Sequence, residues 1–434
     1  MKNIAFRILV LVAVPLVAAS CGKLKSGLPI AGEIDVRHLA TGQYPVEPID
    51  TYKEYSHTFK NGSELAAMRL ADNMATGLDI DPKLKFGTSA EGIEPDLDDA
   101  DIAISNLSMI ISRGSAQAAI HNGMMFGFSS GSSDHEPDRT GKSLSSATTL
   151  TLAVLQFPTA EVASRAAADI EQADFDSAKE KNQRVNLDKY PGAHSHWQPG
   201  IPSLGSFVAH ESYVVMLFAK LPEGGAPELA TFAEKAYDKQ IPMLDKLKPL
   251  TPEDVVKMDP SGEGMIRRII NPNKLYGFYK ESLGVLEKQG FLHFQTDREE
   301  AKKLLDTINV DRFALSDAFQ TVSLNYDETG NTQAFIGKEI AKNSRGGAIL
   351  YRSADEAGAS KAWDRLLRAP DAQMNPKSVP DTKCAQLPDL GYYRQFSCAV
   401  KYHQYVAVVW GPQLDDAQQR AAAQFALLAN SEWM

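Results

Sequence analysis

The order of predicted strands and helices occurs twice along the chain, and this limits the folds that it can adopt. An apolar strand at residues 153–157 and another at residues 348–352 are each followed by a helix. Each helix precedes a hairpin, at residues 207–218 and 399–410, and an Ala-rich amphipathic helix follows each hairpin. The shared order strand–helix–loop–strand–strand–helix predicts a duplicated unit. The alternative is that two unrelated α+β domains share this order by chance.

The two hairpins align on Tyr213 and Tyr405. Strands joined by a hairpin run antiparallel, so an all-parallel doubly wound sheet is excluded. We therefore expect an α+β fold with two tandem related domains, each an antiparallel sheet with helices packed on one face. Prolines at positions 249, 252 and 260 indicate the linker. The predicted domains are residues 33–248 and 262–434, separated by the linker at residues 249–261.

Local signals predict several further elements. Ser63 is predicted to cap the N-terminus of a helix, since its hydroxyl suits that position. Residues 123–128 are predicted as a strand that ends in a polar Ser/Gly-rich loop at residues 129–141. Residues 274–287 have a helical pattern, and Asp327-Glu328-Thr329-Gly330 is a hairpin turn signal between two short strands.

The N-terminus follows the pattern of a secretory leader. Lys2 and Arg7 supply positive charge, an apolar run covers residues 8–17, and the small residues Ala18, Ala19 and Ser20 precede Cys21. The run is too short to span a hydrocarbon core, which needs roughly 20 residues. Residues 1–20 are therefore predicted to be a signal peptide, and residues 21–32 a flexible tether.

The end of this leader resembles the lipobox of bacterial lipoproteins. The resemblance implies that Cys21 becomes the N-terminus and carries a thioether-linked diacylglycerol, with a further acyl chain such as palmitate. Two or more acyl chains hold a protein stably on a membrane. Ala18 stands where the lipobox usually has Leu, so ordinary cleavage before Cys21, with release of the protein, remains the alternative.

The remaining two of the three cysteines, Cys384 and Cys398, are predicted to form a disulfide. An exported chain enters an oxidising compartment, where two remaining cysteines usually form a disulfide with each other. We expect Cys398 in the first strand of the second hairpin and Cys384 in the loop before it. The alternative is a pair of free buried thiols.

Composition places the chain among globular proteins and narrows its partners. The hydrophobic fraction is 43% and the charged fraction 23%, which are ordinary values for globular domains. The formal net charge is −10, and loss of Lys2 and Arg7 with the leader makes it −12. An acidic chain repels phosphate backbones, so a nucleic-acid partner is not expected.

One motif suggests catalysis. Gly127-Phe128-Ser129-Ser130-Gly131 matches G-x-S-x-G, in which the serine of an α/β-hydrolase occupies a tight turn between a strand and a helix. The residues that follow are predicted as a loop, and the parallel sheet of that fold is missing. A serine hydrolase that uses Ser129 is therefore the alternative hypothesis and not the preferred one.

Two further patterns suggest ligand sites. His194 and His196 would lie on one side of an extended segment and, with His135 or Glu136, would imitate a metal site, but no third ligand has suitable spacing. Aromatic residues gather in two groups that would either line an apolar groove between the domains or pack in the core: Tyr276, Phe278, Tyr279, Phe291 and Phe294, and Tyr392, Tyr393, Phe396 and Tyr402. Surface histidines and core aromatics are the preferred interpretations.

Short motifs distributed along the chain carry a family resemblance. They are Ile34-Asp35-Val36-Arg37, Thr41-Gly42-Gln43-Tyr44-Pro45, Met68-Arg69-Leu70-Ala71-Asp72, Asp79-Ile80-Asp81-Pro82, Phe126-Gly127-Phe128-Ser129-Ser130, Gln240-Ile241-Pro242 and Asp259-Pro260-Ser261-Gly262. As a set they resemble actinobacterial cell-envelope lipoproteins of unassigned function. The resemblance implies a lipoprotein with two domains and adds no activity.

These observations favour a non-catalytic protein without metal or cofactor. We expect it to face outward from the cell membrane, anchored by acyl chains on Cys21, and to bind an envelope lipid, a small ligand or an envelope protein. A purely structural role is the third possibility that the sequence leaves open.

Overall fold

A computed structural model describes nine stretches of the chain: residues 35–95, 98–137, 146–272, 283–316, 323–326, 332–335, 346–367, 370–387 and 396–431. The predicted leader, the tether and Cys21 lie outside these residues. The chain divides into a short unit, Met1–Arg37, and a large unit, His38–Met434, which contains every sheet. Among the described residues, no helix combines the length and the apolar character needed to cross a membrane.

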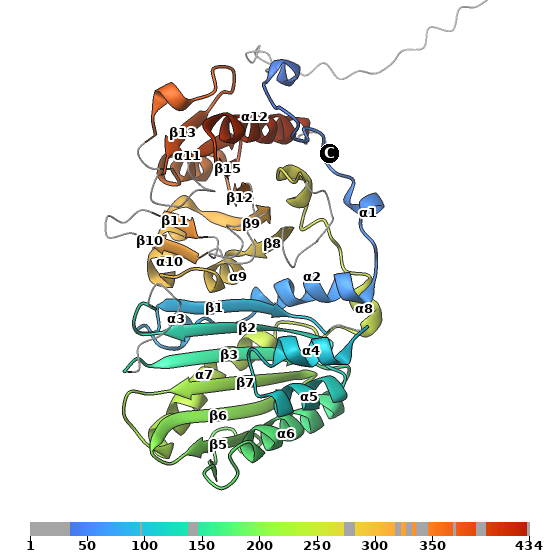
Figure 1. The fold of residues 1–434 in the computed structure, drawn as a ribbon, viewed down its shortest axis with the longest axis vertical. Helices are drawn as coiled ribbons and strands as arrows, with labels where there is room; N and C mark the ends of the chain where they lie inside the picture. The colour runs from blue at the N-terminus through green and yellow to red at the C-terminus, as the bar shows by residue number, and fades with distance from the viewer. Residues whose placement is uncertain are drawn as a thin grey trace, which may run out of the picture. The chain divides into compact units, whose positions relative to one another are not determined.

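The first sheet has seven antiparallel strands in the order β1-β2-β3-β7-β6-β5-β4 (Figure 1). Their bounds are β1 Phe86–Ile93, β2 Phe126–Ser133, β3 Thr149–Gln156, β4 Gln183–Arg184, β5 His194–Gln198, β6 Ile201–His210 and β7 Tyr213–Lys220. The long helices around this sheet are α2 Phe59–Ala71, α4 Ala100–Leu107, α5 Arg113–His121, α6 Ala160–Asp176 and α7 Ala226–Leu244, and the four-residue helices α1 Thr51–Glu54 and α3 Gly77–Ile80 flank α2 in the chain.

The second sheet has six antiparallel strands in the order β13-β14-β15-β12-β9-β8. Their bounds are β8 Leu283–Glu287, β9 Val310–Ser316, β12 Gly347–Ser353, β13 Thr382–Gln386, β14 Phe396–Tyr402 and β15 Tyr405–Gly411. The accompanying helices are α9 Lys288–His293, α10 Arg298–Ile308, α11 Glu356–Arg365 and α12 Leu414–Asn430. The predicted hairpin is present as a separate pair, β10 Ser323–Tyr326 and β11 Thr332–Phe335.

The two sheets share one topology. Read from β8, the second sheet has the order β8-β9-β12-β15-β14-β13, which matches β1-β2-β3-β7-β6-β5 strand for strand in chain order. In both, two helices separate the first and second strands, one helix follows the third strand, and one follows the last hairpin. Both hairpins turn through two residues, with positive φ at Glu211 and His403. The predicted α+β class and tandem related domains are therefore confirmed, and we call the domains the first and second repeat.

The helices lie on both faces of each sheet, whereas one face was predicted. Neighbouring strand residues point to opposite faces. In β6, Phe207 joins the core with Ile170 of α6, whereas Ser206 accepts a hydrogen bond from Tyr237 of α7. In β14, Tyr402 packs on Phe425 of α12, with ring centroids 5.4 Å apart, while Lys401 reaches toward α11. Helical periodicity identifies the buried side of a helix but not which face of a sheet it covers.

Three local predictions were wrong. The α2 helix begins at Phe59 with Thr58 as its N-cap, and Ser63 is buried within it, because Thr58 already accepts the Asn61 N–H at 3.2 Å. Residues 283–287 form the strand β8, so the helical prediction fails there; residues 274–282 lie outside the described part. Strand β2 continues to Ser133, because the residues predicted as a loop are paired with β1 and β3 on both sides.

Two segments near the predicted domain boundaries are packed against other elements. The strap, which we define as residues 39–50, contacts α12 of the second repeat: Tyr44 donates a hydrogen bond to Asp416, and Asn430 Nδ2 donates to Val46 O at 2.8 Å. The predicted linker contains the helix α8 Pro252–Val256. Its Val255 is buried against α2 so closely that a Cβ at Gly62 would lie 1.9 Å from Val255 O.

Candidate functional site: a polar cleft in the first repeat

A cleft of about 330 Å³ lies where the seven-stranded sheet extends beyond the end of α6. Strand pairing places six cleft residues on the sheet face that α6 covers: Thr149, Lys220 and Ser203 in one row, and Thr151, Phe218 and Gly205 in the next. The end of α6 and the following turn supply Asp174, Ser177 and Asn182, and β5 supplies His196 and Gln198.

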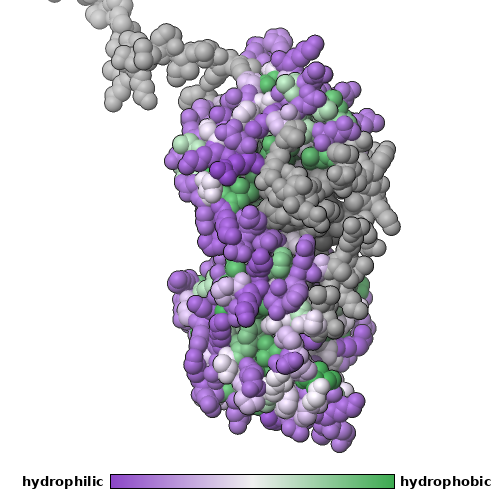
Figure 2. All heavy atoms as spheres, turned by 90° about the vertical axis from the view of Figure 1, so that its left-hand side faces the viewer, coloured by the Kyte–Doolittle hydropathy of each residue, from purple (hydrophilic) through white to green (hydrophobic). Residues whose placement is uncertain are grey.

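This end of the sheet faces the viewer in Figure 2. On the part of the surface that belongs to the first repeat, hydrophobic and near-neutral residues gather within a hydrophilic surround. The lining of the cleft combines small hydroxyl and amide side chains with the rings of Trp197 and Phe218. The volume of the cleft lies within the range of small-molecule sites, although its lining is more polar than is usual for them.

His196 lies between two carboxylates at the edge of the cleft. Its Nδ1 is 2.7 Å from Glu171 Oε1 and its Nε2 is 3.5 Å from Asp174 Oδ2. Glu171 is also bonded to Arg184, whose guanidinium lies 4.1 Å from the centre of the Phe175 ring. The network fixes the imidazole and directs the Asp174 carboxylate along the cleft wall.

The pKa values of the two carboxyl groups are shifted in opposite directions. Burial alone would raise the pKa of Glu171, but its hydrogen bonds from His196 and Arg184 outweigh burial and lower that pKa. At Asp174, burial has the larger effect and raises the pKa, although the charge of His196 opposes it. Glu171 is therefore held ionised as a structural partner, while Asp174 is the more readily protonated carboxyl group and is the one that lines the cleft.

Several polar side chains in the cleft have no protein partner. Within the described residues, the side chains of Thr149, Thr151, Gln198 and Ser203 form no hydrogen bond with the chain. Buried or half-buried polar groups are normally satisfied, so these four are satisfied by whatever fills the cleft, either solvent or ligand. They are the feature of the cleft that most resembles a binding site.

Ser129 does not occupy the position that a nucleophile requires. It lies within β2, opposite Glu91 and Ala153 in the neighbouring strands, and is 3% exposed. A nucleophile elbow places serine on an exposed turn between a strand and a helix. The neighbouring Ser130 does meet a histidine, since its Oγ lies 2.8 Å from His293 Nδ1, but both residues are sealed in the interior.

That interior contact belongs to a junction between the repeats. Arg298 of α10 is fully buried and donates to the hydroxyls of Ser130 and Ser132 and to Gly131 O in β2. It also donates to Leu292 O and His293 O in its own repeat. Burial lowers the pKa of Arg298 to about 10, which leaves it charged at neutral pH.

His293 completes the junction in its neutral form. Burial, reinforced by the charge of Arg298, lowers its pKa to about 3. Its Nε2 lies 3.1 Å from Met74 O, and a carbonyl only accepts, so Nε2 carries the proton and Nδ1 accepts from Ser130. The sequence did not indicate this junction, because its partners are more than 160 residues apart and a lone buried Arg or His has no periodic pattern.

The other sequence candidates are dispersed. His194 is exposed, His196 is bound by Glu171, and His135 bonds Asp134 Oδ1 at 2.8 Å. No group of three or more His, Cys, Asp or Glu side chains is placed to hold a metal ion in the part of the chain that the structure describes. Phe291 stacks on Phe313 and Phe294 packs against Phe128, as expected of core residues; Tyr276, Phe278, Tyr279, Tyr392 and Tyr393 lie outside the described residues.

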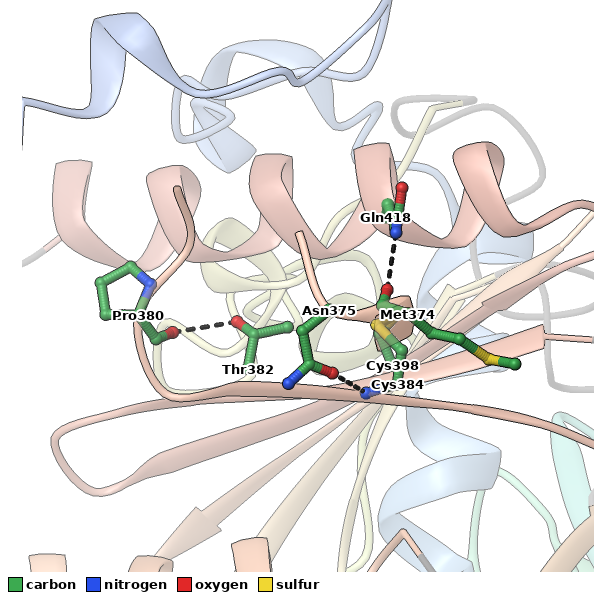
Figure 3. The surroundings of a disulfide bond; sticks show 7 residues. All are labelled: Met374, Asn375, Pro380, Thr382, Cys384, Cys398 and Gln418. Atoms are coloured by element: carbon green, nitrogen blue, oxygen red, sulfur yellow. Dashed lines mark hydrogen bonds between the residues drawn. A yellow bond between two sulfur atoms is a disulfide. The ribbon is translucent and has the colours of Figure 1, made fainter. Parts of the chain in front are cut away.

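Cys384 and Cys398 are joined by a disulfide (Figure 3). They lie directly opposite each other in the paired strands β13 and β14, so Cys384 is in the edge strand and not in a loop as predicted. The surrounding turn is tied to the sheet and to α12: Asn375 Oδ1 accepts from Cys384 N at 2.8 Å, and Gln418 Nε2 donates to Met374 O at 2.6 Å. The bridge stabilises an edge of the second repeat and is not part of a site.

Fold and cleft together define a protein of two tandem, related α+β domains, the first of which carries a polar cleft. Residues 53–260 match the N-terminal domain, and residues 265–431 the C-terminal domain, of a family described as "Domain of unknown function (DUF7373)". The chain therefore belongs to the DUF7373 family.

Among solved structures, the chain is similar to the extracellular domain of PknH from Mycobacterium tuberculosis. The identity is 13% and the TM-score 0.27, over 40% of this chain and 95% of that one. Among proteins with curated descriptions, none matches the chain significantly.

Proposed function

We propose that this protein is an exported, lipid-anchored component of the actinobacterial cell envelope that binds a small ligand in the polar cleft without catalysing its conversion. The leader and Cys21 support export and anchoring, and the motif resemblance supports the envelope of actinobacteria. The family match is consistent with this proposal but names no activity.

One observation carries the binding role. The cleft is a stretch of sheet that no helix covers, and four of its polar side chains have no partner among the described residues. These half-buried side chains converge on one open stretch of sheet, where they can present donors and acceptors to a ligand. The imidazole of His196 is fixed between Glu171 and Asp174, and no serine or cysteine among the described residues is hydrogen-bonded to it, so the arrangement suits recognition more than nucleophilic catalysis.

The position of Gly205 gives a direct test. A Cβ there would meet Asp174 Oδ2 and the His196 ring at 3.4 Å, which is ordinary contact, so Gly205→Ala fits. Gly205→Val adds two methyl groups that extend into the cleft and reduce its volume. Native mass spectrometry of full-length protein purified from its own envelope should show a copurifying ligand with wild type and Gly205→Ala, and none with Gly205→Val.

The same preparation separates binding from other roles. Repeated absence of any ligand in wild type, or equal occupancy in the valine variant, would contradict binding in the cleft. A fluorophosphonate probe provides the enzymatic control: labelling that disappears in Ser129→Ala would establish a serine hydrolase instead.

The anchor is tested independently. Cys21→Ala should move the protein from the membrane fraction to the soluble fraction, and mass spectrometry of the wild-type N-terminal peptide should show the diacylglyceryl modification. Wild-type protein that is soluble and unmodified would refute the anchor and leave the binding role unaffected.

A further inference from the structure

We infer that the cleft recognises a neutral, hydroxyl-rich ligand, such as one saccharide unit of an envelope glycan. This inference rests on the proposed binding function and adds the class of ligand. It follows from the charge balance, the hydrogen-bonding groups and the aromatic side chains of the cleft, Trp197 and Phe218.

The charges of the cleft are balanced before a ligand enters. Asp174 lies beside His196, which is itself bonded to Glu171, and Glu171 is paired with Arg184. Lys220 is the one ammonium group in the lining. A strong anion would meet the Asp174 carboxylate, and a strong cation would meet the ammonium group of Lys220. Either ligand would require a charge to be desolvated without a matched partner, which is costly.

The neutral groups of the cleft match hydroxyl chemistry. Thr149, Thr151 and Ser203 each offer a donor and acceptors, and Gln198 offers two donors and an acceptor. A ligand hydroxyl is also both donor and acceptor, so it pairs with any of them. The Asp174 carboxylate accepts strongly from hydroxyl donors, because hydrogen bonds to an ionised group are about twice as strong as neutral ones.

Phe218 supplies an apolar surface in the floor of the site, and Trp197 also lines the cleft. The Phe218 ring is held edge-on by Phe207, with centroids 5.6 Å apart, and it lies between Thr151 and Gly205 in the floor of the cleft. Gly205 leaves the ring accessible because it has no side chain. A saccharide ring has C–H groups on one face and hydroxyls at its rim, so it can contact Phe218 while its hydroxyls reach the surrounding polar groups.

The test uses saturation-transfer NMR on the mature protein with defined probes. The neutral probes are glucose, N-acetylglucosamine and maltose, and the charged probes are lysine, glutamate and inorganic phosphate. We expect saturation transfer to at least one neutral saccharide and none to the charged probes. Gly205→Val should abolish the saccharide signal, and Asp174→Asn should weaken its affinity by about tenfold or more, since a charge-assisted hydrogen bond becomes neutral.

Two matched variants control for nonspecific effects. Asp176→Asn changes the same residue type on the same helix, but Asp176 is exposed and bonds Gln172 instead of lining the cleft. This variant should bind like wild type. Gly205→Ala separates backbone effects from loss of volume at the valine position, and its affinity should lie between those of wild type and Gly205→Val.

The outcomes distinguish the ligand class from the binding function. A charged probe that binds in wild type and is lost in Gly205→Val would overturn the saccharide inference while supporting a ligand in the cleft. A non-saccharide ligand in native mass spectrometry would do the same. Absence of both saccharide binding and any copurifying ligand would overturn the inference and the proposed function together.

Discussion

The same position of the sheet is open in the first repeat and filled in the second. When the hairpins are aligned on Tyr213 and Tyr405, Phe218 is equivalent to Trp410 and Gly205 to Ser397. On the strand that pairs with this residue, Thr151 is equivalent to Gly347, because Thr151 pairs with Phe218 and Gly347 pairs with Trp410. Phe218 is partly exposed in the cleft, whereas Trp410 is 1% exposed.

Residue size accounts for the difference. A Cβ at Gly347 would lie 2.4 Å from Trp410 Cζ2, so the indole occupies the space that a side chain on the facing strand would need. In the first repeat the smaller ring of Phe218 pairs with Thr151 of β3, and on β6 the paired residue is Gly205, which has no side chain to fill the space. One architecture therefore provides a packed core at one copy and an open polar cleft at the other.

Truncating the two aromatic residues should give the largest contrast. Trp410→Ala removes a fully buried side chain and should lower the free energy of unfolding by about 3–5 kcal/mol. Phe218→Ala removes a partly solvated ring and should cost clearly less. Urea denaturation of both variants measures this difference, and equal losses would show that the cleft is as tightly packed as its counterpart.

The disulfide is a second difference between the repeats, because among the described residues it is present in the second repeat and not in the first. The cysteines are 14 residues apart in sequence, and closing a loop of this length stabilises by about 3 kcal/mol in the chain-entropy model. The double variant Cys384→Ala/Cys398→Ala should lose about that much. Adding reductant should destabilise wild type similarly and leave the variant unchanged. Two alkylatable thiols in unreduced wild type would contradict the bridge.

The helix after the first strand also differs between the repeats. In the first repeat, α4 exposes Ile102, and Met109 just beyond its end is exposed as well; in the second, α9 ends at the buried His293 against β2.

The pKa of His293 is about 3 in the folded protein and about 6.5 in the unfolded chain, so between these two pH values the unfolded chain binds more protons than the folded protein. Stability from this residue is therefore lost as the pH falls below about 6.5.

His293→Gln should make acid destabilisation less steep. Glutamine retains an N–H donor for Met74 O but does not titrate. Between pH 6 and pH 4 the wild-type free energy of unfolding should fall faster than that of the variant by about 1.4 kcal/mol per pH unit. Urea titrations at several pH values provide the measurement, and parallel pH profiles would show that His293 is protonated in the folded protein.

The smallest effect is expected at the cleft itself. Gly205→Ala should change the free energy of unfolding by less than about 0.5 kcal/mol, because a Cβ there makes only ordinary contacts. The matched change Gly347→Ala should be severely destabilising, since its Cβ would overlap the Trp410 ring. Thermal denaturation compares the two, and similar melting temperatures would contradict the open-versus-filled distinction.

The sequence predicted what depends on local pattern. The hairpins at residues 207–218 and 399–410 follow from strand alternation and turn residues, and the structure has both. The duplication was visible because both copies keep the same order of such local signals. The α+β class followed from it.

The sequence did not predict what depends on contacts between distant residues. Nothing near Arg298 in sequence indicates that Ser130 and Ser132 will surround its guanidinium. The cleft was likewise missed: His196 was noted, but only for its spacing to His194, because Glu171 and Asp174 reach it from α6. The sequence did contain one signal for the cleft. The Ala-rich helix that packs on the sheet carries two carboxylates, Glu171 and Asp174, and the strand at residues 194–198 carries His196.

The strap determines where mechanical load enters the folded protein. A chain held at its N-terminus transmits any pull first to residues 39–50, which are fastened to α12 through Asp416 and Asn430. The ring of Tyr44 also lies 4.6 Å from the guanidinium of Arg420. Under the proposed anchoring, tension on the N-terminus would reach α12 of the second repeat through these contacts before it reached the cleft of the first repeat.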